Sequence, residues 1–257
     1  MKDYKLLKVN LKDNIVIVEM NRKHEMNALS SDLLEEIDHL FSYFLKQNTD
    51  LRVVVFTGGD ECFSAGLDLK ELASLNDAGL TKYVNLTLDV YFRLMDYENI
   101  LITAVSGIAM GGGFNLALMG DIIIASETAL FVHPEIKYGF NPLLTPLVSR
   151  IGVAKSKELT LRGEPIGAHE AYQIGLVNKV VTPECFREEA SSWAEKLSGR
   201  PIEAVRALKR SFDVVTRLDA RAAIEYELEK TAVFLSREDL RARLKELLTH
   251  RTHGSKG

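Results

Sequence analysis

Hydrophobic and polar positions change their spacing several times along the first half of the chain. Continuous apolar runs rich in β-branched residues are typical of buried strands, and they occupy Asn14–Met20, Leu51–Thr57, Ile100–Val105 and Asp121–Ala125. Between these runs apolar residues recur at helical spacing, which predicts helices over Ser30–Lys46, Thr81–Asp96 and Gly113–Met119. Ser30 is expected to cap the first of them. Because strands and helices alternate, the pattern predicts the α/β fold class, with parallel strands and crossover helices.

The pattern becomes mainly helical after Pro142. Strand signals weaken there, and the apolar spacing predicts helices over Pro183–Leu197, Pro201–Val215 and Asp219–His250, the last one broken near Ser236. We therefore expect a core domain over residues 1–195 and a C-terminal helical region over residues 196–257. This region would cover its own domain or pack on another subunit. The polar tail His250–Gly257 is expected to be disordered.

The composition is that of an ordinary globular protein: 46% of the 257 residues are hydrophobic, enough for one large domain or a domain with a helical appendage. A net charge of −4 without a basic stripe argues against nucleic acid as a partner. No apolar run reaches the ~18 residues of a membrane span, and no hydrophobic leader follows the first residues. Cys62 and Cys185 match no metal-ligand spacing. We expect a cytoplasmic protein with neither a membrane partner nor a metal.

Two segments of small residues carry the strongest chemical signal. Gly111, Gly112 and Gly113 follow a predicted strand and precede a predicted helix, and Ser64, Ala65 and Gly66 follow another predicted strand. Glycine loses more conformational entropy on folding than other residues, so runs of glycine are typical of places where the backbone closely approaches a ligand or another part of the chain. A tight turn between strand and helix is the structural alternative. Two such loops at the ends of two strands could aim two N–H groups at one point, which is the design of an oxyanion hole.

Four segments, taken in order, resemble the signatures of the crotonase superfamily, the enoyl-CoA hydratases and isomerases. Phe63–Leu69 is similar to F-x-A-G-x-D-I/L, and Gly107–Asp121 is similar to G-x-x-x-G-G-G-x-E-L-A-x-x-x-D. Asn21-Arg22 with Asn27-Ala28-Leu29 fits the N-R-P…N-A-L segment, and Ala168–Val181 fits A-x-E-A-x-x-x-G-L-V-D/N-x-V-V. The resemblance covers roughly residues 5–250. Each motif alone is weak, whereas four in the right order are specific.

The resemblance implies a spiral of ββα units followed by a C-terminal helical trimerisation region, in a homotrimer or a dimer of trimers. It implies an acyl-CoA thioester as substrate, with coenzyme A as part of that substrate and no separate cofactor. The thioester carbonyl would sit between the backbone N–H groups of Ala65 and Gly112, which would stabilise an enolate. The substrate-binding positions that it implies are Glu25, Met26, Ser64, Ala65, Leu67, Asp68, Leu69, Gly111, Gly112, Pro134 and Leu143.

Departures from the family pattern bear on the reaction. Hydratases of this family use two glutamates, and the first of these positions holds Asn115, whereas the second is kept as Glu135. Asparagine can neither give nor take a proton at neutral pH, although it could hold a water or the substrate. Isomerases of the superfamily likewise keep only the second glutamate. We therefore expect a 3-enoyl-CoA to trans-2-enoyl-CoA isomerase with Glu135 as proton shuttle and with Asn115, Ala65 and Gly112 completing the catalytic set.

The sequence also allows other functions. An enoyl-CoA hydratase is the first alternative, followed by a polyketide-type decarboxylase or a non-catalytic homologue that binds acyl-CoA or RNA. Leu143 occupies the position where dienoyl isomerases and dehalogenases carry an aspartate, which disfavours both. Glu135 has apolar neighbours, so we expect it to be at least partly buried. His24 and His133 have no evident nucleophile partner and are expected to be surface or core-edge histidines.

Overall fold

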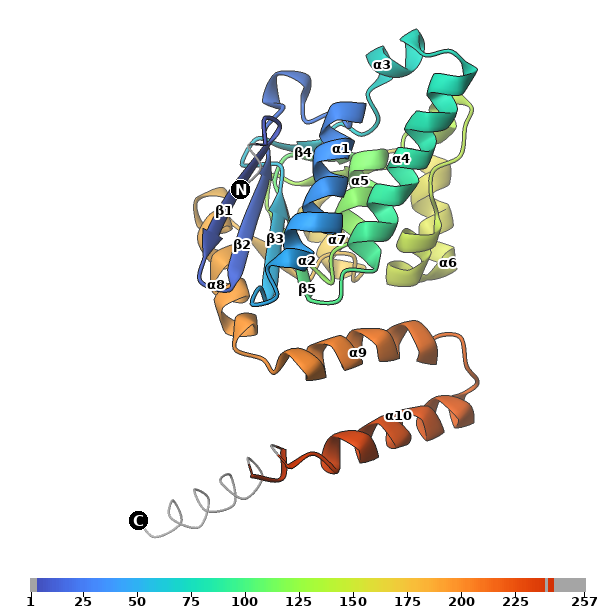
Figure 1. Cartoon of the computed structure of the whole chain (residues 1–257). Coiled ribbons are helices and arrows are strands. Elements are labelled where there is room, and N and C mark those ends of the chain that lie inside the picture. The colour runs from blue at the N-terminus through green and yellow to red at the C-terminus, as the bar shows by residue number, and fades with distance from the viewer. Residues whose placement is uncertain (1–3, 239, 243–257) are drawn as a thin grey trace. The chain divides into compact units, whose positions relative to one another are not determined.

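Two β-sheets frame the first part of the chain in the computed structural model, which describes residues 4–238 and 240–242 (Figure 1). The larger sheet has the strand order β1 (Leu7–Lys12), β2 (Ile15–Met20), β3 (Val53–Thr57), β5 (Ile100–Val105), β7 (Ile122–Ser126) and β10 (Lys179–Val181). All its neighbouring strands are parallel except β1 and β2. The smaller sheet has the order β4 (Cys62–Ser64), β6 (Ile108–Met110), β8 (Leu130–Val132) and β9 (Ile166–Gly167). The predicted parallel α/β architecture is confirmed.

The two sheets are connected by a unit that occurs three times in succession. Each time, one strand of the larger sheet leads into one strand of the smaller sheet and then into helix. The order is β3, β4, α3 (Leu69–Ser74) and α4 (Asp77–Met95); then β5, β6 and α5 (Gly112–Leu118); then β7, β8, η3 (Glu135–Tyr138) and α6 (Thr145–Arg162). This succession is the spiral of ββα units that the family resemblance implies.

Helices cover the larger sheet and bury its apolar residues. The predicted helix behind Ser30 is present as α1 (Ser31–His39), η2 (Leu40–Phe44) and α2 (Leu45–Gln47), and the Ser30 side chain accepts a hydrogen bond from the Leu33 N–H. Helix α1 packs beside α4 (Figure 1). Helix α8 (Phe186–Ser198) packs on β2, β3, β5 and β7. The remaining short helices are η1 (Lys23–Glu25), α7 (Ala168–Gln173) and η4 (Pro183–Cys185).

The chain divides into two compact units, Met1–Ile202 and Glu203–Gly257. The boundary that the sequence suggests, at 195/196, falls inside α8. The second unit contains α10 (Ala220–Leu235) and all of α9 (Ile202–Val215) except its first residue. Ser236 ends α10, which confirms the predicted break there, whereas the predicted polar tail His250–Gly257 lies outside the described residues. Within the described residues, no helix is both long and apolar enough to cross a membrane.

Candidate active site

Two loops of small residues meet where neighbouring strands of the smaller sheet end. Strands β4 and β6 are parallel, with Ser64 paired to Ala109, so their following loops leave the same edge. The loops approach closely: a Cβ atom added to Gly113 would lie 2.5 Å from the Ser64 carbonyl oxygen, and one added to Gly66 would lie 2.6 Å from the Met110 carbonyl oxygen. Real Cβ contacts are longer than this, so both positions require glycine. The two glycine segments therefore converge.

The backbone donors left free at this junction include the N–H groups of Leu67 and Gly112. Within the part of the chain that the structure describes, neither group donates a hydrogen bond, and Gly112 opens α5, where N–H groups lack helical acceptors. The residues touch, because a Cβ atom added to Gly112 would lie 3.0 Å from Leu67 Cδ2. The Ala65 N–H, expected to be one of the oxyanion donors, instead donates to the Met26 carbonyl oxygen at 2.9 Å. This bond corrects the assignment of Ala65.

The amide of Asn27 holds the first loop in place. Asn27 is fully buried, and its Nδ2 donates to three carbonyl oxygens, those of Gly58, Cys62 and Phe63, at 3.0, 3.0 and 3.2 Å. The Ser64 hydroxyl donates to the Asn27 carbonyl oxygen at 2.8 Å and accepts from the Gly66 N–H at 3.1 Å. Ser64, a predicted substrate-binding residue, is fully buried and therefore acts as a support for the loop rather than as part of its surface.

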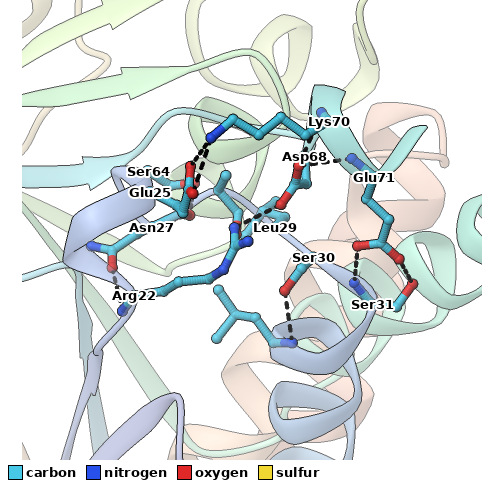
Figure 2. A network of polar contacts seen from close by, with 12 residues as sticks. Arg22, Glu25, Asn27, Leu29, Ser30, Ser31, Ser64, Asp68, Lys70 and Glu71 are labelled. Atoms are coloured by element: carbon cyan, nitrogen blue, oxygen red, sulfur yellow. Dashed lines mark hydrogen bonds and ion pairs between the residues drawn. The ribbon is translucent and has the colours of Figure 1, made fainter. Parts of the chain in front are cut away.

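Asp68 connects the same loop to the N-terminal part of the chain through an ion pair. Its Oδ2 lies 2.7 Å from Nη1 of Arg22, and its Oδ1 accepts hydrogen bonds from the Lys70 and Glu71 N–H groups at the start of α3 (Figure 2). Burial by itself raises the pKa of Asp68, but the Glu71 N–H and the Arg22 guanidinium outweigh it and bring that pKa below its usual range. Asp68 is therefore a structural anion in the loop.

Three further predicted substrate-binding residues lie on the surface beside this loop. Met26 is 48% exposed and Leu69 is 67% exposed, which is unusual for apolar side chains of this size. The Glu25 carboxylate pairs with Lys70 at 2.9 Å (Figure 2). The hydrogen bond from Lys70, together with its charge, lowers the pKa of Glu25. These side chains form an outer rim, and their contact with coenzyme A stays a prediction.

Glu135 reaches the site from the segment that follows β8. It begins η3 directly after Pro134, which is partly buried, and Glu135 itself is only 6% exposed, as its apolar neighbours predict. A Cβ atom added to Gly111 would lie 3.0 Å from Glu135 Oε1, so Gly111 leaves room for the carboxylate. The nearby His133 Nδ1 lies 3.4 Å from both carboxylate oxygens.

Asn115 occupies the first turns of α5, beside the second glycine loop. Its N–H donates to the Gly111 carbonyl oxygen at 2.9 Å, and its side chain is 4% exposed and bonded to the Tyr91 hydroxyl. Tyr91 Oη also donates to the Gly112 carbonyl oxygen at 2.9 Å. Burial raises the pKa of Tyr91, and the charge of Glu135 raises it further, so Tyr91 stays a neutral donor. Tyr91 therefore links Asn115 to the glycine loop, a contact that sequence reasoning missed.

Several buried polar atoms in this region have no hydrogen-bond partner among the described residues. These atoms are Asn115 Oδ1, His133 Nε2 and Glu135 Oε2. An unsatisfied buried polar group costs roughly 1–3 kcal/mol, so a fold retains such a group chiefly where something else binds it. Because the three atoms lie on the residues around Gly111 and Gly112, they mark the ligand position more directly than the shape of the loops does.

The remaining predicted residue, Leu143, is partly buried and packs against the hydrophobic core just before α6. A loop leucine there can border an acyl chain but cannot take part in proton transfer. In the described part of the chain, no group of three or more His, Cys, Asp and Glu side chains is arranged to hold a metal ion. The groups that the site offers to a ligand include the buried Glu135 carboxylate, the free N–H groups of the two loops and the Asn115 amide.

Comparison with known proteins identifies the family of the chain and supports its fold. Residues 10–252 match the enoyl-CoA hydratase/isomerase family. A short-chain-enoyl-CoA hydratase of Clostridium acetobutylicum is 34% identical over 228 residues, which cover 88% of this chain and 87% of that protein. An enoyl-CoA hydratase structure from Bacillus anthracis has a TM-score of 0.89 at 30% identity and covers 97% of both chains. A Thermobifida fusca protein crystallised with acetoacetyl-CoA has a TM-score of 0.82 at 28% identity, covering 90% of this chain and 95% of that one.

Proposed function

The chain belongs to the enoyl-CoA hydratase/isomerase family of acyl-CoA-processing enzymes, and within it we propose that the protein converts 3-enoyl-CoA to trans-2-enoyl-CoA. The observation that carries this proposal is the unequal pair of side chains at the site. Glu135 is a buried carboxylate with one unpartnered oxygen, whereas Asn115 supplies an amide where the hydratases that the chain resembles have a glutamate. A double-bond shift needs one group that takes and returns a proton, and one carboxylate suffices for it.

The substrate in this proposal is an acyl-CoA thioester. Binding of acetoacetyl-CoA by the structurally similar Thermobifida fusca protein supports that substrate class. The thioester oxygen would accept hydrogen bonds from the Leu67 and Gly112 N–H groups, which donate to no described acceptor and belong to residues that pack together. Each such donor, aimed at the developing negative charge, typically contributes about 2.7–4 kcal/mol to lowering the barrier. These donors replace the Ala65 and Gly112 pair expected from the sequence.

The proton then moves in two steps. Glu135 Oε2 takes a proton from C2 of the 3-enoyl thioester, and the electron pair of the broken C–H bond enters a dienolate whose negative oxygen is held by the two N–H groups. Glu135 returns the same proton to C4, and the double bond forms between C2 and C3. Asn115 and Leu143 border the acyl chain in this scheme, and neither side chain exchanges protons.

Enoyl-CoA hydration is the second candidate. It is supported by the names of the relatives, because the Clostridium acetobutylicum and Bacillus anthracis proteins are both enoyl-CoA hydratases. Hydration adds water across the double bond, so it needs a group that activates the water and a group that protonates the enolate. Asn115 can hold a water through its unpartnered Oδ1 but cannot accept its proton. We therefore propose isomerisation, rather than hydration, as the main activity.

The experiment that separates the two candidates compares two substrates on one enzyme preparation. We expect 3-hexenoyl-CoA to be converted to the conjugated thioester, which is followed by the rise of its ultraviolet absorbance. We expect crotonyl-CoA to lose that absorbance at least ten times more slowly, because no second proton-transfer group is present. The reverse ranking of the two rates would show that the protein is a hydratase.

A further inference from the structure

We propose that His133 is a positioning residue for Glu135, holding one carboxylate oxygen so that the other faces the ligand. The inference rests on the proposed function only in taking Glu135 as the group that moves the proton. His133 lies two residues before Glu135, at the end of β8, and its side chain is 1% exposed. A buried histidine at this place is not accounted for by the reaction described above.

Hydrogen bonding, rather than distance, distinguishes the two oxygens of the carboxylate. His133 Nδ1 lies 3.4 Å from each of them, and its long hydrogen bond is made with Oε1. Oε1 also faces the space left by the absent side chain of Gly111. Oε2 makes no hydrogen bond with any described residue. One oxygen is therefore held from the protein side, and the other remains available to a substrate.

The surroundings of the imidazole determine which nitrogen carries the proton. Nε2 is buried and has no hydrogen-bond partner in the part of the chain that the structure describes. If Nε2 carried the proton, a buried N–H would be left without an acceptor while the lone pair of Nδ1 faced the lone pairs of a carboxylate. With the proton on Nδ1, that N–H has the Glu135 oxygen as its acceptor, and only a lone pair at Nε2 is unsatisfied, which is the less costly of the two. His133 is therefore a donor to Glu135.

Packing keeps the imidazole in this orientation. The ring lies 4.7 Å from the Phe114 ring, centroid to centroid, at an interplanar angle of 33°, and Phe114 in turn contacts Phe131 at 5.4 Å. The backbone is fixed on one side by the hydrogen bond from the Gly111 N–H to the Val132 carbonyl oxygen. On the other side Pro134 restricts the backbone by its ring. Packing therefore fixes the orientation in which the imidazole donates its hydrogen bond to Glu135.

Among the described residues, His133 is the side-chain hydrogen-bond donor to Glu135. Tyr91 also interacts with Glu135, but its hydroxyl donates to the Gly112 carbonyl oxygen instead. Without His133 the carboxylate could rotate about its last torsion, which has a broad energy profile. Transfer from C2 to C4 on one face of the acyl chain requires an oxygen that stays on that face, so free rotation would slow proton transfer without weakening thioester binding.

The test follows exchange of the C2 protons of hexanoyl-CoA in deuterium oxide by NMR, because this exchange reports proton transfer by Glu135 whatever the net reaction. In the variant His133→Phe the ring remains but the donor is lost, and we expect exchange to slow by roughly 10–100-fold. In His133→Asn the amide nitrogen replaces Nδ1, and we expect exchange within about fivefold of wild type. The Kd for hexanoyl-CoA should stay within about threefold in both variants.

Two results would overturn the positioning role. One is a wild-type exchange rate in His133→Phe, and the other is an equally slow His133→Asn variant whose thermal melting matches wild type. If His133→Phe does not fold, His133→Leu provides the same loss of the donor at a smaller volume. A parallel measurement on Glu135→Gln separates the two proposals: full exchange in that variant would contradict the proposed function, whereas loss of exchange there with normal exchange in His133→Phe would contradict only the role of His133.

Discussion

Asn115, His133 and Glu135 each contribute one buried polar atom that no other described residue bonds, and all three residues lie beside the Gly111–Gly113 loop. In a core selected only for stability, such atoms are paired or replaced by apolar groups, because each costs roughly 1–3 kcal/mol. Their concentration in one region is the signature of a site that a ligand completes. It is also why single substitutions here should change chemistry more than stability.

The first prediction concerns Asn115. Replacing it with glutamate supplies the second proton-transfer group that hydration needs, so Asn115→Glu should create or raise crotonyl-CoA hydration, by roughly 10-fold or more. Asn115→Gln is the matched control, because it has the same length and shape but cannot transfer a proton. Hydration is measured as loss of crotonyl-CoA absorbance. A wild-type enzyme that already turns over crotonyl-CoA at ~10²–10³ s⁻¹ would contradict this assignment of Asn115.

The second prediction concerns the pH dependence of stability. The pKa of Asp68 is lowered in the folded state, so its stabilising effect is present above its unfolded pKa, about 3.9, and is lost as pH falls through the folded value. At pH 7, Asp68→Asn should lower the free energy of unfolding by roughly 1.5–3 kcal/mol, because the partner of Arg22 is removed. The difference between wild type and variant should shrink below about pH 4.

Urea unfolding at a series of pH values measures this effect. Glu25→Gln is the control, because the Glu25–Lys70 pair is exposed and should contribute little to stability. An Asp68→Asn penalty that is the same at pH 3 and at pH 7 would show that the ion pair with Arg22 is not its source.

At the scale of elements, the glycine loops are held by direct packing of one against the other. Gly113 in α5 lies against Ser64 at the end of β4, and a Cβ atom there would come within 2.5–2.7 Å of three Ser64 atoms. Overpacking of this kind typically costs about 1–3 kcal/mol. It would also separate Leu67 from Gly112, since these follow Ser64 and precede Gly113 in the two loops.

The third prediction follows from that contact. Gly113→Ala should lower stability by roughly 1–3 kcal/mol, and at conditions where it is folded it should slow turnover by at least 10-fold. The matched control is Gly199→Ala at the end of α8, where an added Cβ atom meets nothing within 4 Å. Denaturant unfolding and the 3-hexenoyl-CoA assay are run on both variants. Normal activity in a stably folded Gly113→Ala would mean that the loop spacing is unimportant for the reaction.

The hydrophobic pattern of the sequence is sufficient to predict the long buried strands, because β3 and β5 are apolar at nearly every position. It did not reveal β1, whose apolar residues alternate with Lys8, Asn10 and Lys12 and which lies mostly exposed at the sheet edge. The three-residue strands β4, β6 and β8 carry too few positions for a period to be visible. Helix α6 was also missed, and the left-handed conformation of Gly152 (φ +73°) interrupts its helical spacing.

In the site, too, features that depend on neighbouring residues could be predicted from the sequence, whereas features that depend on contacts between distant residues could not. Burial of Glu135 follows from its apolar neighbours in the sequence. The identity of the free N–H groups does not, because it depends on a bond between Ala65 and Met26, which are far apart along the chain. The signal that could have pointed to Leu67 is Gly66, since a glycine at φ +90° redirects the peptide that follows it. Tyr91, likewise, reaches the site only through the fold.

At the scale of the whole molecule, we propose that the chain forms a homotrimer or a dimer of trimers through its C-terminal unit. The support is the exposure of large apolar side chains on its helices. On α9 these are Leu208 and Phe212, one turn apart, and on α10 they are Ile224, Leu228 and Leu235, which share one helix face. Apolar surface of this kind on a folded chain is typical of protein–protein contact.

The fourth prediction tests this assembly. Size-exclusion chromatography with light scattering should give three or six times the chain mass of 28.7 kDa. Leu228→Glu should reduce the mass to that of the single chain, because a charge is placed at the apolar contact. Val233, also exposed but on the other side of α10, provides the control variant Val233→Glu, which should keep the wild-type mass. A single-chain mass for the wild-type protein at micromolar concentration would contradict the proposed assembly.

The most direct test of the central claim is the isomerisation of 3-hexenoyl-CoA by wild type and Glu135→Gln, measured as formation of the conjugated thioester. The variant is nearly isosteric but cannot accept the C2 proton. We predict that its turnover falls by ~10² or more, while its Kd for hexanoyl-CoA stays within about fivefold of wild type. Glu164→Gln, which removes an exposed carboxylate paired with Lys137, should leave turnover unchanged. Full isomerase activity in Glu135→Gln would show that another group carries the proton and would contradict the account.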